Sequence, residues 1–164
     1  MDPREDLVVR ARVSDGKAEE GGGPLGTVET FDHTADVGLR VRGSDLNDLF
    51  RTAAEGVFDY IVVNRAEVRS EEHESVSLDA DSTEELLAAW LNELIFRCET
   101  KHRLFSRFDV RVAADGRGLQ AEIAGEPIAR DRHVLDHEVK AVTHHGLTLQ
   151  RGGSGWLAEL ILDI

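Results

Sequence analysis

Cysteine is almost absent from this chain of 164 residues, because Cys98 is the only one. A single thiol excludes an intramolecular disulfide, and its scarcity suits a reducing compartment such as the cytoplasm. Long apolar runs are also absent, so the sequence predicts no membrane-spanning segment. The first six residues, MDPRED, carry too much charge for a secretory signal. We therefore expect a soluble, cytoplasmic protein that does not enter a membrane.

Positive charge is scarce as well. The chain has 19 Lys and Arg residues against 32 Asp and Glu residues, which gives a formal net charge of -13. An acidic surface repels the phosphate backbone of nucleic acids, so we expect no stable direct binding to RNA or DNA. Two compatible explanations of the acidity stay open. One is a basic protein partner, and the other is adaptation to high salt, since the only lysines are Lys17, Lys101 and Lys140.

Several common catalytic motifs are missing. The stretch GGGPLG lacks the Lys-Ser/Thr pair of a phosphate-binding loop, and the chain has no GxSxG, no HExxH and no paired cysteines. His144 and His145 are adjacent, but neighbours on a strand point to opposite faces, so we do not expect them to share a metal ion. Four other histidines are interpreted as surface residues: His73, His102, His133 and His137.

Two amphipathic helices are the clearest elements. We expect Ser44 to cap the first, whose apolar residues recur every three or four positions up to about Asp59. Ser82 and Glu85 fit a capping box for the second helix. The apolar stripe of the second helix ends at Cys98, which predicts that this thiol is a core residue rather than a nucleophile.

Alternating apolar residues predict strands along most of the remaining chain, and DGRG joins two of them as a hairpin turn. These strands lie at about residues 39–42, 75–80, 108–112, 119–123, 139–150 and 156–164. Residues 1–27 are rich in glycine and charge, so we expect a flexible extension before one domain at residues 28–164. The order of elements predicts an α+β fold, a single domain with two long helices packed on a mostly antiparallel sheet.

Carboxylates are the remaining candidates for chemistry. The stretch FDHTADVGLR places Asp32 and Asp36 close together, and Asp163 interrupts the apolar strand that closes the chain. A buried carboxylate needs a partner, because leaving it unpaired is costly. From the residues alone, an Arg, a Lys or a helix N-terminus is favoured as the partner of Asp163 over a hard cation such as Ca²⁺ or Mg²⁺.

An ordered set of segments resembles the archease family. The segments are FDHTADVGLRVRG with the following DLNDLFRTAAEGVFDYIV, then ELLAAWLNELIF, HEVKAVTHHGL and the closing GWLAELILDI. The resemblance implies a small protein that activates the RtcB-type RNA ligase, the enzyme that joins tRNA halves. It implies that the protein promotes guanylylation and repeated turnover of that ligase, and broadens its use of nucleotides, without catalysing a reaction itself.

The resemblance also implies a metal site, which reverses the preference stated above for Asp163. The implied ligands are Asp36, Asp163 and Ile164, the last through a main-chain or terminal oxygen. Ca²⁺ is the favoured ion, with Mg²⁺ or Mn²⁺ as alternatives. We expect Asp36 to lie in a loop before the first strand, and Gly38 to let the backbone come close to the last strand.

Two other classes of function stay open. A small metal-dependent hydrolase or nuclease would need further ligands and a general base, for which His145 and Glu138 are the only nearby candidates. The second class is a chaperone-like interaction module without catalysis. Asp32 and His33 are expected either to shape the loop around Asp36 or to contact the partner protein.

Overall fold

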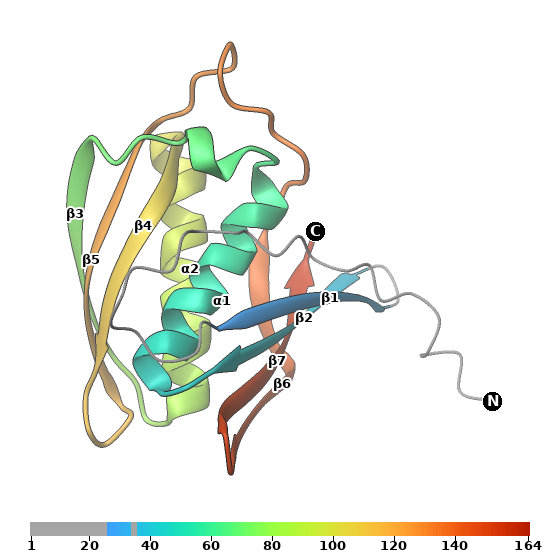
Figure 1. Cartoon of the computed structure of the whole chain (residues 1–164), viewed down its shortest axis with the longest axis vertical. Helices are drawn as coiled ribbons and strands as arrows, with labels where there is room; N and C mark the ends of the chain where they lie inside the picture. The colour runs from blue at the N-terminus through green and yellow to red at the C-terminus, as the bar shows by residue number, and fades with distance from the viewer. Residues whose placement is uncertain (1–25, 34–35) are drawn as a thin grey trace.

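Two helices form the middle layer of the molecule, with an antiparallel sheet on either side (Figure 1). The structure is a computed structural model that describes residues 26–33 and 36–164. The α+β prediction is confirmed, but the single predicted sheet is in fact two sheets, one of four strands and one of three. No helix in the described residues is long and apolar enough to cross a membrane.

The four-stranded sheet brings together segments from opposite ends of the chain. Its order is β1 (Thr27–His33), β2 (Asp36–Gly43), β7 (Gly155–Asp163) and β6 (Ala141–Gly152). β2 and β7 pair directly, from Val37 opposite Leu162 to Gly43 opposite Trp156. β1 begins at Thr27, where the predicted flexible extension ends, and residues 1–25 of that extension lie outside the described residues.

The second sheet has three strands. Its order is β3 (Glu72–Asp79), β5 (Gly118–Pro127) and β4 (Arg103–Val112). The predicted hairpin turn between β4 and β5 is confirmed. Asp115 accepts the backbone N–H of Arg117 at 3.0 Å, and Gly116 has a left-handed φ of 72° that favours glycine.

Helix α1 (Leu46–Ile61) begins one residue later than predicted. Its N-cap is Asp45, whose carboxylate accepts the backbone N–H of Asp48 at 2.8 Å. Ser44 instead donates its backbone N–H to the Asp48 carboxylate at 2.8 Å, so it precedes the cap. The helix ends at Ile61, because Val62 adopts an extended conformation.

Helix α2 (Thr83–Lys101) begins as predicted, with Ser82 accepting the backbone N–H of Glu85 at 3.2 Å. Its apolar stripe lies in the core between the two sheets. Trp90 is fully buried there and donates its indole N–H to the backbone oxygen of Phe50 in α1 at 3.0 Å. This bond satisfies the one polar group of the Trp90 side chain and ties the two helices together.

Residues 128–140 connect β5 to β6 and therefore cross from one sheet to the other. Three backbone hydrogen bonds of 2.8 Å fix this crossover: Ile128 to His102, Val63 to Val134, and Lys140 to Asp163. The crossover consequently runs past the end of α1 and finishes beside the end of β7.

Candidate functional site

The stretch from Phe31 to Arg40 forms part of a β-hairpin rather than a loop. β1 ends at His33 and β2 begins at Asp36, and these two residues pair. The prediction that Asp36 lies in a loop is therefore wrong, because it is the first residue of β2 and is half-buried. β1 carries polar residues on both faces, so its sequence lacks the alternation that predicts a strand.

Asp36 and Asp163 are brought together by the pairing of β2 with β7. The last pair of that register is Val37 with Leu162, and the next position of the same register places Asp36 opposite Asp163. Residues directly opposite on antiparallel strands have Cβ atoms roughly 4.5–5.5 Å apart. The two aspartates that the sequence singled out therefore lie on neighbouring strands at one end of the four-stranded sheet.

The chemistry of this pair suits a hard cation. Like charges directly opposite each other destabilise a sheet. Within the described residues, the carboxylate of Asp163 has no side-chain hydrogen bond or ion pair. Carboxylate and main-chain oxygens are the ligands of Ca²⁺ and Mg²⁺, which commonly complete their coordination with water. No group of three or more His, Cys, Asp or Glu residues that could hold a metal is found in the described residues.

The remaining predicted site residues flank this pair. Ile164 directly follows Asp163 and is 37% exposed. The backbones of Asp32 and His33 belong to β1. Their side chains lie outside the described residues, so the roles expected of them stay predictions.

Gly38 makes room for a neighbouring side chain. A Cβ atom at this position would lie 2.1 Å from Cζ of Phe31, so the absence of a side chain leaves room for the Phe31 ring. Phe31 belongs to β1, on the side of β2 away from β7. Gly38 also pairs with Ile161 of β7, so its backbone does lie beside the last strand. The missing side chain therefore accommodates the Phe31 ring in addition.

Three of the four histidines interpreted as surface residues are exposed: His73, His102 and His137. The interpretation is wrong for His133, which is 3% exposed. His144 and His145 are both exposed at a register shift of β6 between Thr143 and Thr148.

His133 belongs to a buried polar cluster that the sequence did not indicate. Its Nε2 lies 2.6 Å from Oε1 of Glu126, which is 2% exposed, and Arg132 donates a hydrogen bond to the same oxygen. Nδ1 of His133 accepts the backbone N–H of Ala129 at 2.9 Å, so the neutral ring carries its proton on Nε2, facing Glu126. The cluster ties the crossover of residues 128–140 to the end of β5.

The charge balance of this cluster favours an ionised Glu126. Burial alone would raise the pKa of this carboxyl, but the hydrogen bond and positive charge of Arg132, together with His133, outweigh burial and lower its pKa. Within the described residues, Oε2 of Glu126 is buried without a hydrogen-bond partner. The carboxylate therefore relies on two partners that both reach the same oxygen.

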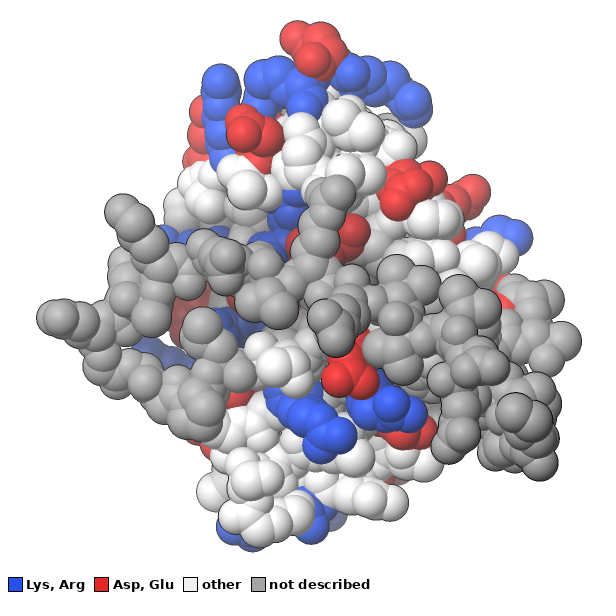
Figure 2. Space-filling model, turned by 45° about the vertical axis from the view of Figure 1, so that its right-hand side comes forward, with Lys and Arg blue, Asp and Glu red and all other residues white. Residues whose placement is uncertain are grey.

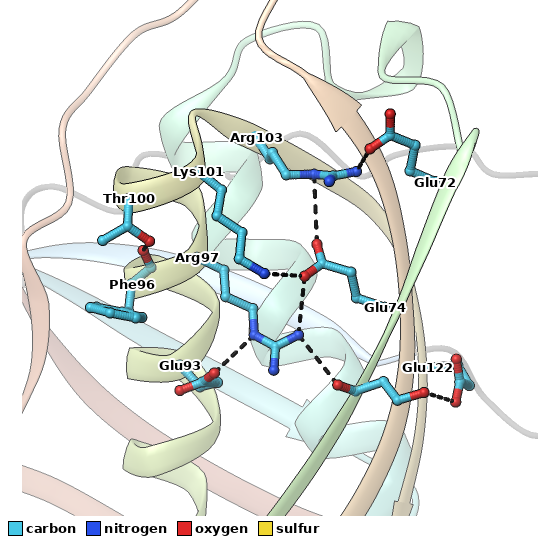
Figure 3. A network of polar contacts seen from close by, with 10 residues as sticks. Glu72, Glu74, Glu93, Phe96, Arg97, Thr100, Lys101, Arg103 and Glu122 are labelled. Carbon is cyan, nitrogen blue, oxygen red and sulfur yellow. Dashed lines mark hydrogen bonds and ion pairs between the residues drawn. The ribbon is translucent and has the colours of Figure 1, made fainter.

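A second charged cluster joins α2 to β3, as Figure 3 shows. Glu74 receives Lys101 at 2.7 Å and Arg97 at 3.3 Å, and Arg97 also reaches Glu93 at 2.8 Å. Burial opposes ionisation of Glu74, but Lys101 and the neighbouring arginines outweigh it and lower the pKa of Glu74. These positive charges are matched by carboxylates, so the cluster is a structural contact between helix and sheet.

Cys98 is half-buried and packs against the core, in agreement with its predicted role. Burial raises the pKa of its thiol to about 11. Because the thiolate is the reactive form, a pKa this high makes Cys98 a poor nucleophile near neutral pH.

The exposed surface carries both signs of charge. On the face seen in Figure 2, the Lys and Arg side chains are interspersed with Asp and Glu side chains. The excess of acidic residues is therefore not gathered into one surface of a single sign on this face.

These observations define the class of the protein. It is a small α+β protein with two helices between two antiparallel sheets, and it places two aspartates from distant parts of the chain side by side at one sheet end. The chain belongs to the archease family, because the model described as "Archease protein family (MTH1598/TM1083)" matches residues 29–164.

Individual relatives agree with this assignment. The chain is 36% identical to a protein archease of Methanopyrus kandleri over 138 residues, covering 83% of this chain and 98% of the relative. It is 32% identical to a protein archease of Pyrococcus abyssi over 139 residues, covering 83% of this chain and 97% of the relative.

Solved structures have the same fold. The solution structure of protein 1598 of Methanobacterium thermoautotrophicum has a TM-score of 0.66 at 29% identity, covering 82% of this chain and 96% of that chain. A crystal structure from Thermotoga maritima, described as "an archease, possible chaperone", has a TM-score of 0.58 at 17% identity. It covers 90% of this chain and 100% of that chain, and at this identity it supports the fold alone.

Proposed function

We propose that this protein is a non-catalytic activator of an RtcB-type RNA ligase. It promotes guanylylation and repeated turnover of the ligase in tRNA splicing or RNA repair, and broadens the nucleotides that the ligase accepts. The observation that carries the proposal is the position of Asp36 opposite Asp163, at one end of a sheet in a chain of the archease family. In this proposal the chain acts in the cytoplasm.

The aspartate pair is proposed to hold a divalent cation, Ca²⁺ in preference to Mg²⁺ or Mn²⁺. Asp36 and Asp163 would each contribute a carboxylate, and Ile164 a main-chain oxygen. When bound, the cation would supply a positive charge that attracts carboxylate and phosphate oxygens. The chain itself fixes the two carboxylates on paired strands, so that they do not need to be ordered when the ligase arrives.

The proposed partner is a protein rather than RNA. A net charge of -13 disfavours contact with a phosphate backbone and suits a ligase whose own surface is basic enough to bind RNA. Asp32 and His33 lie in the same hairpin as Asp36 and are proposed to shape that hairpin or to contact the ligase.

A guanylylation assay with and without the ligase tests the proposal. The protein alone should leave RNA and nucleotides unchanged, and adding it to the ligase should accelerate formation of the guanylylated ligase and allow repeated turnover. Turnover of RNA or nucleotide without ligase would instead identify a metal-dependent hydrolase or nuclease. Absence of stimulation, combined with protection of unrelated proteins from aggregation, would identify a chaperone-like module.

Deletion of residues 1–25 should change neither the melting temperature nor the stimulation of the ligase. The reason is composition, since GGGPLG and the charged residues around it are poor in the apolar side chains that a packed segment requires. The family match also begins after this segment, at residue 29. Thermal melts and the guanylylation assay check this prediction, and a clear loss of either property would contradict it.

A further inference from the structure

We infer that Phe31 is a positioning residue for the aspartate pair, meaning that its ring fixes the strands that carry Asp36 and Asp163. The inference rests on the proposed function, because it takes the pair to be a cation site. It concerns the face of the four-stranded sheet that points away from the helices. The opposite face carries fully buried core residues such as Leu39 and Leu160.

The residues on this outer face form rows across the strands. One row contains His33, Asp36 and Asp163, and the adjacent row contains Phe31, Gly38 and Ile161. Residues two apart on a strand face the same side and are roughly 7 Å apart. The Phe31 row is therefore the nearest row on this face whose packing can set the position of the aspartates.

The Phe31 ring lies directly over the backbone of β2 at Gly38. Three ring atoms lie within 2.4 Å of the point where a Cβ atom of Gly38 would be, so any side chain there would displace the ring. An aromatic ring over a cross-strand glycine covers backbone that the glycine leaves open and fixes the register of the two strands.

Arg40 contacts the ring from the next row, on the side away from the aspartates. Its guanidinium carbon lies 5.4 Å from the centroid of the Phe31 ring. Arg40 is itself fixed by Glu159 of β7 at 2.9 Å and by Glu29 of β1 at 3.5 Å. Its hydrogen bond to Glu159 is the main cause that raises the pKa of Arg40. These contacts link β1, β2 and β7, the strands that carry and support the aspartates.

Ile161 lies in the row next to the pair and is buried. It is 6% exposed, and it lies beside the register shift of β6, where a Cβ atom on Gly146 would be 3.2 Å from its side chain. Gly146 has a φ of 79°, a left-handed conformation that favours glycine. A buried apolar neighbour lowers the local dielectric constant, and electrostatic attraction between carboxylates and a cation grows as that constant falls.

Loss of the ring should therefore weaken cation binding more than it weakens the fold. Without Phe31, the backbone at Gly38 becomes open to water, and Arg40 keeps Glu29 but loses the ring as its second contact with β1. The two carboxylates then have to be brought into position by the cation itself. The residues packed around a metal site control how far solvent reaches it. Replacing residues that support the ligands typically lowers metal affinity by about 10–100-fold.

Calorimetric titration of the full chain with Ca²⁺, paired with thermal melts in a chelator, tests the inference. Phe31→Ala should weaken Ca²⁺ binding by about 10–100-fold, and Phe31→Tyr, which keeps the ring, should retain the wild-type affinity. Val28→Ala is the matched control, because Val28 lies on the same strand but packs against the core and Gly56. It should lower the melting temperature while leaving Ca²⁺ affinity unchanged.

The outcomes separate this inference from the proposed function. If the wild-type chain binds none of Ca²⁺, Mg²⁺ and Mn²⁺, both the proposed site and the role of Phe31 are wrong. If the wild type binds and Asp36→Asn does not, but Phe31→Ala binds as tightly as the wild type, only the inference about Phe31 is wrong. It is equally wrong if Val28→Ala weakens binding as much as Phe31→Ala does, because the effect then follows from stability alone.

Discussion

Replacing Glu126 with alanine should lower the free energy of unfolding by about 3 kcal/mol, the lower end of the range for breaking a buried ion pair. Glu126 and His133 are 2% and 3% exposed, so removing the carboxylate leaves a buried imidazole facing a cavity. The lower end is expected because the Arg132 side chain is 33% exposed and can turn toward water. Urea unfolding at pH 7 measures the loss.

Glu122→Ala is the matched control for this prediction. Glu122 lies on the same strand, but it is exposed, and among the residues that the structure describes its side chain accepts a hydrogen bond only from Ser75, at 2.6 Å. Its replacement should change the free energy of unfolding by no more than about 0.5 kcal/mol. Equal losses in the two variants would show that the buried cluster contributes no more to stability than a surface residue.

The pH dependence of stability should identify the ionised carboxylate of Glu126. Because the folded state lowers its pKa, the stabilisation by Glu126 is fully present above the ordinary value of about 4.3 and is lost as pH falls through the folded pKa. The stability difference between the wild type and Glu126→Gln should therefore be constant from pH 7 to about pH 5 and shrink below it. Urea titrations at pH 7 and in acid check this.

The helices were predictable because their signals are local. Ser82 and the apolar stripe that follows it specify α2 within a few residues, and the structure has the same cap. The start of α1 is less certain from sequence, since Ser44, Asp45 and Asp48 are all good capping residues. Only the three-dimensional contacts show that Asp45 caps the helix and that Ser44 bonds back to Asp48.

The features that sequence did not indicate depend on contacts between distant segments. The buried state of His133 depends on the crossover of residues 128–140 folding over Glu126, and neither residue lies in a pattern that predicts burial. The division into two sheets depends on which strands pair, which alternation along one strand cannot specify.

The aspartate pair was predictable in part: its residues could be named from the sequence, but their meeting could not. The family resemblance pointed to Asp36 and Asp163, but nothing local shows how residues so far apart in the chain meet. The pairing of β2 with β7 supplies that information, because it places the two positions opposite each other. It also changes the design of the experiment, since Asp36 is a half-buried strand residue and needs a substitution that keeps its size.

Asp36→Asn should reduce stimulation of the ligase to the rate of the ligase alone while leaving the protein folded. Asparagine keeps the size of the side chain but removes one of two carboxylates, so the proposed cation loses a charged ligand. In the absence of divalent cations the variant should be at least as stable as the wild type, because repulsion between opposing carboxylates is relieved. Single-turnover guanylylation and thermal melts, with and without Ca²⁺, measure both effects.

Leu94→Ala should show the opposite result, a loss of stability without a loss of ligase stimulation. Leu94 is fully buried in α2, so its truncation should cost roughly 2–5 kcal/mol through a cavity in the core. The fraction of Leu94→Ala that stays folded should nevertheless stimulate the ligase normally, because it retains both aspartates. If folded Asp36→Asn stimulates guanylylation as well as the wild type does, the pair of carboxylates is not the active part of the molecule, and the proposed mechanism is wrong.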